Sequence, residues 1–306
     1  MRVFVTGASG HVGSAVIPEL LDAGHEVTGL ARSEEAAATI ERAGASVLRG
    51  ALDGDLEVLA DGARDADAVI HLAFRHDWMQ TGDFAGAVAS DLAALTAMGE
   101  ALTGSGKALV STSPSGMLAL GGVSGRPGTE DDVIEGGPRV DAENHVIGLA
   151  AHGVRSAVVR LPPTVHSDLD QAGFVPSMIQ IARDKGYAAY VGAGENRWCA
   201  CDTRDAAHLY RLAIESAPAG SRLHAVAEEG IAFREIAETI ASMLELPVRG
   251  IEPDEAEEYF GFLARFAAMD NPVSSARTRQ LLGWEPTRPG LLADLEAGHY
   301  FRQPVA

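Results

Sequence analysis

The chain has 306 residues, 46% of them hydrophobic, and a formal net charge of −19. This length allows a full doubly wound sheet with a smaller lobe, and the composition is that of a globular protein. The acidic balance argues against binding to nucleic acid or to an anionic membrane surface, both of which need a basic face.

No apolar run is long enough to span a bilayer, and the first strand begins without a basic leader or cleavage site. We therefore expect neither a transmembrane helix nor a signal peptide. The two cysteines, Cys199 and Cys201, lie too close together for an unstrained disulfide and have no second ligand pair nearby. These features favour buried thiols, no bound metal and a cytoplasmic location.

Apolar strands alternate with helical patterns through the first half of the chain. The predicted strands lie near 2–6, 26–31, 46–48, 67–71, 107–112 and 155–160, and the predicted helices near 11–23, 34–43, 55–62, 83–103 and 138–151. This alternation predicts an α/β fold, a Rossmann-type doubly wound parallel sheet with helices on both faces. The long segment 114–137, rich in Gly, Pro and Ser, reads as an active-site loop or lid.

The pattern changes after residue 165. Helices are predicted near 173–185, 204–217, 231–244, 254–268 and 275–282, with short strands near 188–191 and 222–226.

The most informative stretch is the glycine turn Thr6–Gly13, which follows the first strand and opens an amphipathic helix. Its glycines allow a sharp turn and a close approach of the backbone to a pyrophosphate. The helix start offers free N–H groups and the positive end of the helix dipole to the phosphates. Strand, glycine turn and helix together predict a dinucleotide site.

The glycines at positions 7, 10 and 13 resemble those of the short-chain dehydrogenase/reductase superfamily, in particular its extended and atypical, epimerase/dehydratase-like branch. Later landmarks of that branch are matched by 69–73, 109–113, 158–165, 205–207 and 282–286. The resemblance covers nearly the whole chain. It implies a dinucleotide-binding domain at 1–165 plus 201–226, and a smaller C-terminal substrate lobe at 166–200 plus 227–306.

The end of the second strand bears on the choice of nicotinamide cofactor. An NAD enzyme would carry an acidic residue near Ala31, whereas Arg32 and Ser33 here suit the 2′-phosphate of NADP. We therefore favour NADP over NAD. The alternative is an exposed arginine beside a serine that only caps the next helix. Leu52 resembles the apolar contact to adenine in the family.

The family's usual Tyr-x-x-x-Lys pair, which delivers a proton during hydride transfer, is absent. The chain has lysine only at Lys107 and Lys185, and neither follows a tyrosine by four residues. If Glu143 is the family's glutamate eight positions beyond the tyrosine, Glu135 takes the tyrosine position and Arg139 the lysine position. Glu135 could donate a proton only if burial raised its pKa. Ser113 matches the serine that polarises a carbonyl in the family.

Other candidates lie on loops at the carboxyl ends of strands. The segment Phe74–Met79 reads as a pocket wall, and within it His76 could shuttle a proton, as could His166. A structural role for each histidine is the alternative. A further aromatic and methionine group reads either as a cavity lining or as lobe core: Phe174, Met178, Trp198 and Tyr259.

The candidate catalytic residues are thus Ser113, His76 and Glu135. The candidate cofactor-binding residues are Gly7, Ser9, Gly10, His11, Val12, Gly13, Arg32, Ser33, Leu52, Leu72, Ala73, Phe74, Arg139 and Pro162.

Together these observations predict an NAD(P)H-dependent oxidoreductase that transfers hydride to a small apolar carbonyl or imine substrate. Two alternatives remain open, a non-catalytic NADP-binding regulator and a redox-neutral epimerase or dehydratase. The expected partner is a small-molecule substrate, with no nucleic acid or membrane, and a homodimer is plausible.

Overall fold

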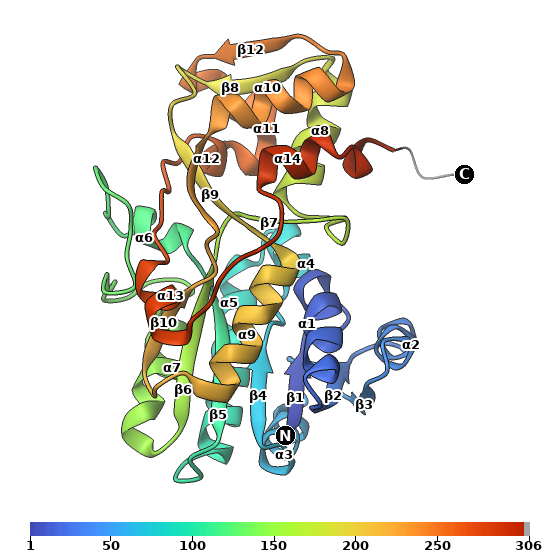
Figure 1. Cartoon of the computed structure of the whole chain (residues 1–306), viewed down its shortest axis with the longest axis vertical. Helices are drawn as coiled ribbons and strands as arrows, with labels where there is room; N and C mark the ends of the chain where they lie inside the picture. The colour runs from blue at the N-terminus through green and yellow to red at the C-terminus, as the bar shows by residue number, and fades with distance from the viewer. Residues whose placement is uncertain (303–306) are drawn as a thin grey trace.

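A seven-stranded parallel sheet forms the body of the protein (Figure 1). The computed structural model describes residues 1–302, apart from the side chains at positions 79 and 80. The strands are β1 (Arg2–Thr6), β2 (Glu26–Ala31), β3 (Ser46–Arg49), β4 (Ala68–His71), β5 (Ala108–Pro114), β6 (Arg155–Leu161) and β10 (Ser221–His224). Their order, β10-β6-β5-β4-β1-β2-β3, confirms the predicted Rossmann-type fold.

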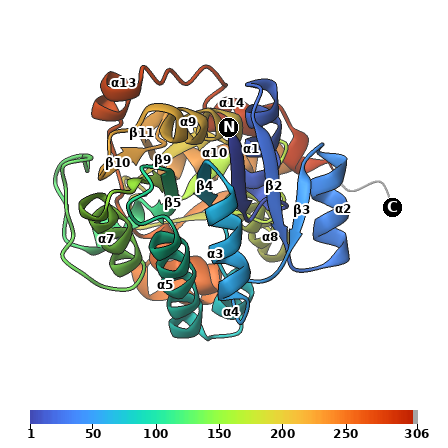
Figure 2. The same ribbon diagram turned by 90° about the horizontal axis from the view of Figure 1, so that it is seen from below.

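Helices cover both faces of this sheet (Figure 2). One face carries α1 (His11–Asp22), α2 (Glu34–Arg42) and α9 (Thr203–Ser216), and the other carries α3 (Leu56–Asp65), α5 (Phe84–Ala101) and α7 (Val140–Gly148). On α1, Val16, Ile17 and Leu20 are fully buried against the strands, at the spacing of one helical face. Because all seven strands are parallel, their carboxyl ends meet at one edge of the sheet.

A second core lies beyond that edge, at the top of Figure 1. Its main elements are α8 (Phe174–Lys185), β8 (Ala188–Val191), α10 (Phe233–Leu244), β12 (Val248–Ile251), α11 (Ala256–Phe260), α12 (Ala264–Ala267) and α14 (Leu291–Glu296). The fully buried Trp198 packs edge-on against Phe233, 4.9 Å away between ring centroids. A three-stranded sheet of β7 (Thr164–His166), β9 (Arg197–Asp202) and β11 (Glu228–Ala232) links this lobe to the body.

Several elements of the second half differ from the prediction. The expected helix 254–268 is broken into short pieces, because Gly261 adopts a positive φ of 55° between α11 and the turn that follows. The strand β9 was not predicted, since five of its six residues are buried and it therefore lacks the alternation of a half-exposed strand. The short helix α14 was also missed, as were α4 (His76–Gln80) and α6 (Gly116–Leu120) in the first half.

The segment 114–137 is not a free lid. It contains α6, and the backbone of Gly128 exchanges two hydrogen bonds with the segment near Pro272, each 2.8 Å long. The buried Glu130 carboxylate accepts from the backbone N–H and the hydroxyl of Thr278. The segment is therefore fastened to the C-terminal quarter of the chain.

Trp284 also lies away from the upper lobe. It belongs to the core beneath the large sheet, and its indole N–H donates to the carbonyl of Asp205 at 3.0 Å. The Asp205 carboxylate accepts from the backbone N–H groups of Thr287 and Arg288. The division of the chain into two domains stays a prediction, and this contact shows that residues near 284 pack on α9.

Two further features concern the apolar character of the helices and the state of the thiols. Among residues 1–302, no helix combines the length and apolar character that crossing a membrane requires. Cys199 and Cys201 are both free and fully buried, and burial raises the pKa of the Cys199 thiol to about 12. Such thiols are unreactive at neutral pH.

A buried charge cluster fixes α7 to the sheet. The Arg160 guanidinium on β6 donates to both carboxylate oxygens of Glu143, at 3.1 and 2.5 Å, and Arg222 donates to one of them at 2.9 Å. Burial alone would raise the pKa of Glu143, but the bond to Arg160 and its charge outweigh it and bring the pKa below the ordinary 4.5.

Replacing Glu143 by alanine tests how much this cluster contributes to the free energy of unfolding. Glu143→Ala leaves two buried guanidinium groups without their carboxylate, so we expect a loss of about 3–5 kcal/mol in the free energy of unfolding. Glu135→Ala, on the exposed loop before α7, is the control and should change it by less than about 0.5 kcal/mol. Urea unfolding measures both, and equal effects would contradict the expectation. Because the folded pKa is lowered, the stabilisation is present above pH 4.5 and is lost as the pH falls through the folded value.

Candidate functional site

The glycine turn between β1 and α1 has the geometry of a phosphate cradle. Gly7 has a φ of +68°, and a Cβ there would lie 2.7 Å from the backbone nitrogen of Ala73. At Gly13 a Cβ would overlap the carbonyl of Gly7 and lie 2.6 Å from that of Ala8. Gly10 caps α1 in an extended conformation, and no side chain in the described part of the chain accepts a hydrogen bond from the first N–H groups of the helix. These groups are left for an anionic ligand.

His11, beside this turn, connects it to the upper lobe. Its Nε2 lies 2.8 Å from Thr203 Oγ1 at the start of α9, and its Nδ1 lies 3.8 Å from the buried Asp170 carboxylate. Burial lowers the pKa of His11 below 6.5, so the ring is neutral at pH 7. Ser9 and Val12, on either side, are half-buried.

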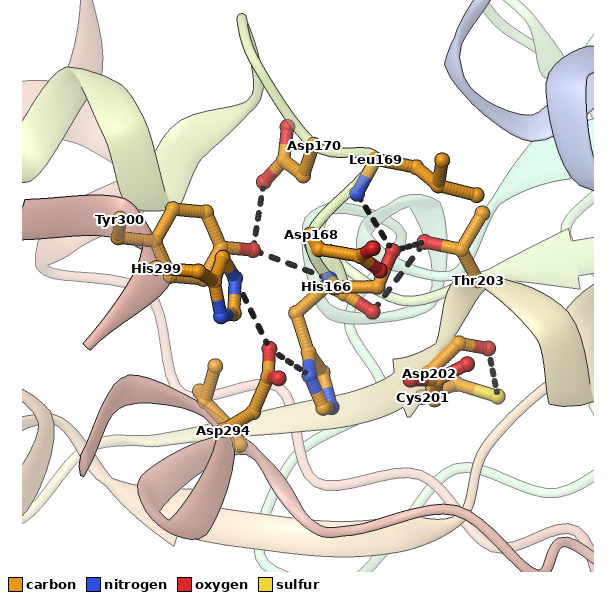
Figure 3. A network of polar contacts seen from close by, with 12 residues as sticks. His166, Asp168, Leu169, Asp170, Cys201, Asp202, Thr203, Asp294, His299 and Tyr300 are labelled. Carbon is orange, nitrogen blue, oxygen red and sulfur yellow. Dashed lines mark hydrogen bonds and ion pairs between the residues drawn. The ribbon is translucent and has the colours of Figure 1, made fainter. Parts of the chain in front are cut away.

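Figure 3 shows how the network continues from Thr203. The Ser167 hydroxyl donates to Thr203 at 2.8 Å, and the Tyr300 hydroxyl, 3.1 Å from the Ser167 backbone N–H, reaches Asp170 at 3.3 Å. His166 Nδ1 lies 2.9 Å from Asp294 on α14. His166 is thus a buried member of a network that joins the glycine turn to the last helices.

The residues predicted for the adenosine half lie at neighbouring strand ends. Ser33 Oγ accepts a hydrogen bond from the backbone of Ala36, so it caps α2 as the alternative interpretation held. Arg32 Nη1 donates to Asp77 at 3.1 Å. Leu52 is 6% exposed and packs in the core on the α3 side of the sheet. Asp53 forms an ion pair with Arg75.

Arg139 lies at the carboxyl edge of the sheet beside the end of β4. Its guanidinium stacks 3.9 Å above the Phe74 ring, and Nη2 donates to the carbonyl of Thr112 at 3.1 Å. Its Nε lies 3.8 Å from Asp91 on α5. Burial lowers the pKa of Arg139, and the Asp91 carboxylate opposes that shift, so the guanidinium stays charged at neutral pH.

Ser113 ends β5 next to the carbonyl that Arg139 holds. It is 2% exposed, and its Oγ has no hydrogen-bond partner among residues 1–302. A buried hydroxyl without a partner is costly unless a ligand satisfies it. Leu72 and Ala73 are half-buried at the end of β4, and Pro162 is buried just after β6.

Glu135 does not meet the condition set for a proton donor. Its side chain is exposed on the loop before α7, and only its backbone carbonyl is engaged, by Asn144. The burial that this role requires is absent, so we no longer consider Glu135 the proton donor.

His76 is the other candidate at this edge. Its ring packs edge-on against Phe74, with 5.1 Å between centroids, and stays accessible to solvent. Loss of hydration and the charge of Arg139 lower its pKa below 6.5. By contrast, Phe174, Met178, Trp198 and Tyr259 all lie in the upper core, as the core interpretation held.

The sequence did not point to three polar residues beneath this site. His71 Nε2 lies 3.0 Å from Asp91, and its Nδ1 lies 2.8 Å from the Thr6 hydroxyl. All three side chains are buried. The available signal was a histidine ending an apolar strand and an aspartate on the apolar helix α5. A buried polar residue at such a position needs a partner, which here comes from another element.

Comparison with known proteins identifies the family. Residues 3–138 match the NAD-dependent epimerase/dehydratase family. An uncharacterised protein of Schizosaccharomyces pombe is 45% identical over 303 residues, covering 98% of this chain and all of the relative. The chain belongs to the NAD-dependent epimerase/dehydratase family, the extended branch of the short-chain dehydrogenase/reductases. A ketoreductase of Stigmatella aurantiaca, which acts on a farnesyl dihydroquinoline oxide, is 28% identical, covering 72% of this chain and 66% of its own.

Solved structures of this family share the fold. UDP-glucose 4-epimerase of Thermotoga maritima superposes with a TM-score of 0.76 at 17% identity, covering 98% of both chains. dTDP-glucose 4,6-dehydratase of Streptomyces venezuelae, solved with NAD, gives 0.76 at 19% identity, covering 98% of this chain and 96% of its own. The family and these relatives are enzymes, and the family is NAD(P)-dependent. The glycine cradle of this chain fits that cofactor class.

A methyl group in the cradle should abolish cofactor binding. Gly7→Ala is strained at a φ of +68° and collides with the backbone at Ala73, so we expect the Kd for NAD(P)H to rise at least about 100-fold. The control is Gly148→Ala on α7, where the new Cβ meets nothing within 4 Å. Titration followed by nicotinamide fluorescence measures both. Binding by Gly7→Ala equal to that of the control would exclude the glycine turn as the phosphate site.

Proposed function

We propose that this protein is an NADP-dependent reductase of a small, largely apolar carbonyl compound. A nicotinamide cofactor supplies the hydride when it is bound. The chain's residues orient the substrate and stabilise the negative charge that develops on its oxygen. The observation that carries the proposal is Arg139, a buried cation beside Ser113 at the carboxyl end of β5.

Arg139 and Ser113 together suit an oxygen that gains negative charge. The Ser113 hydroxyl has no partner at hydrogen-bond distance among residues 1–302, but it lies near the Glu143 carboxylate, whose pKa it helps to lower. By turning from Glu143 it can donate to a carbonyl oxygen. Arg139 holds a fixed positive charge nearby, pinned by the Thr112 carbonyl and by the Phe74 ring. A charge in a partly desolvated site stabilises an oxyanion more strongly than it would in water.

The same cation distinguishes carbonyl from iminium substrates. An iminium carries a positive charge before hydride arrives, and Arg139 would repel it. Asp91, 3.8 Å away, offsets this repulsion only in part, because it also faces His71. We therefore place ketones and aldehydes ahead of imines. The ketoreductase of Stigmatella aurantiaca supports the same order.

His76 is our candidate for donating a proton to the oxygen of the substrate as the carbonyl is reduced. It extends from the loop that holds Phe74, and its ring is open to solvent, from which it can be reprotonated. A redox-neutral epimerase or dehydratase reaction is less favoured, because it needs a base to remove the proton that the family's tyrosine takes. Tyr210, whose hydroxyl lies 2.6 Å from Thr112, is fully buried under the sheet, and burial raises its pKa.

Substitution of Arg139 tests the oxyanion role. With NADPH and a panel of ketones, Arg139→Met should lower kcat/KM by about 100-fold to 1000-fold, the loss typical of one oxyanion donor. Arg139→Lys keeps a charge and should retain more activity. Arg42→Met, on the exposed face of α2, is the control for removing an arginine. Nicotinamide absorbance reports turnover, and thermal unfolding checks that each variant is folded. Full activity of folded Arg139→Met would contradict the proposal. Faster turnover of cyclic imines than of the matched ketones would also contradict it.

The pH profile tests His76. If protonated His76 donates the proton, kcat/KM for reduction should fall about tenfold per pH unit once the pH exceeds its pKa. That pKa is below 6.5, so the fall should begin on the acid side of pH 6.5. His76→Gln should flatten this limb. A limb that persists unchanged in the variant would assign the titration to another group.

A further inference from the structure

Four charged residues from three neighbouring strand ends meet at the adenosine side of the site. Arg32 follows β2, Asp53 follows β3, and Arg75 and Asp77 follow β4. In the sheet, β2 lies between β1 and β3, and β4 lies on the other side of β1. The contacts therefore reach across the carboxyl edge in front of β1, where the glycine turn begins.

Asp77 sits between two guanidinium groups. Its Oδ1 accepts from Arg75 Nε at 3.0 Å, and its Oδ2 accepts from Arg75 Nη2 at 3.0 Å and from Arg32 Nη1 at 3.1 Å. The hydrogen bonds from Arg75, followed by those from Arg32, hold the pKa of Asp77 well below its usual range. The Asp77 carboxylate therefore occupies the position between Arg32 and Arg75 in which the two guanidinium groups could bind another anion.

Arg75 is positioned in advance, whereas its partners are exposed. Its guanidinium lies 4.1 Å over the Trp78 ring, and its side chain is 14% exposed, against 58% for Arg32 and 45% for Asp77. Asp53 contacts Arg75 from the side of β3. A further arginine, Arg49, is paired with Glu34 and with the Ser33 carbonyl. Asp77, on the short helix α4, is bound to both arginines but is 45% exposed, so an anion from solvent can reach the guanidinium groups that it neutralises.

We propose that Asp77 is an internal competitor for the 2′-phosphate of NADP. In the free protein its carboxylate neutralises Arg32 and Arg75, and the 2′-phosphate displaces it and takes over both guanidinium groups. This inference rests on the proposed NADP-dependent function and adds a selectivity element to it. A phosphate carries close to two negative charges and three acceptor oxygens, so it is a stronger partner for paired arginines than one carboxylate.

Displacement of Asp77 would also change the position of His76, the proposed proton donor. His76 and Asp77 are consecutive residues at the start of α4. Release of Asp77 from its two arginines therefore frees the turn that bears the His76 ring. The 2′-phosphate thus influences the position of His76, although it binds at the other end of the cofactor.

The test is a cofactor titration of wild type and three variants. Asp77→Asn keeps the shape of the side chain but cannot neutralise two guanidinium groups, so the Kd for NADPH should fall about three- to tenfold. The Kd for NADH, which lacks the 2′-phosphate, should change by less than about twofold. Arg75→Met should raise the Kd for NADPH at least about tenfold, with little effect on NADH. Asp65→Asn, on the exposed surface of α3, is the matched charge control.

The outcomes separate the inference from the proposed function. If wild type binds NADPH but Asp77→Asn leaves its Kd unchanged or higher, the competitor role is wrong and the reductase proposal stands. If Asp77→Asn weakens NADH, Asp77 is a ribose ligand instead, which also overturns the inference. If wild type binds neither cofactor, both proposals fall. Thermal unfolding of each variant excludes misfolding as the cause.

Discussion

The site depends on a close approach between two pieces of backbone. Gly7 leaves β1 with a positive φ, and its Cα packs directly against the backbone at Ala73, where β4 ends. A side chain at position 7 would separate these two strand ends. Because Gly7 has no side chain, the glycine turn before α1 lies close to the segment that carries Phe74, Arg75 and His76. The proposed sites for the phosphates, the adenosine and hydride transfer therefore all lie around one turn.

If Glu143 is the family's glutamate, Arg139 stands at the position of the usual lysine, and this changes the chemistry that the site can perform. The family's tyrosine and lysine form a proton-donating pair, whereas Arg139 cannot give up a proton at neutral pH. It is held by a backbone carbonyl, an aromatic ring and a buried carboxylate. In the proposed function, the chain retains the stabilisation of negative charge and needs a separate proton donor. His76, whose ring packs against the same Phe74 ring that Arg139 stacks on, is our candidate for that donor.

Much of the large domain followed from the sequence, because its strands are apolar, its helices amphipathic and its turn chemistry local. The glycine turn and the six strands of the first half needed only short-range patterns. The charged contacts of the site could not be predicted from such short-range sequence patterns. Asp77 meets Arg32, and Arg139 meets Asp91, across more than forty residues of chain. Such pairs depend on which strands are neighbours and on side-chain direction, which no local pattern records. The strand β9 escaped for another reason, since its nearly complete burial removes the period-two signal.

The contacts of His11, together with the network drawn in Figure 3, connect the upper lobe to the glycine turn. His11 belongs to that turn, Thr203 to the start of α9, and Asp170 and Tyr300 to segments that pack with the lobe. If the upper lobe moved away as a rigid unit, His11 would lose these contacts. If the protein turns over a bound dinucleotide as we propose, movement of these segments away from the glycine turn would accompany release of the cofactor, and the rate of that movement would set an upper bound on turnover.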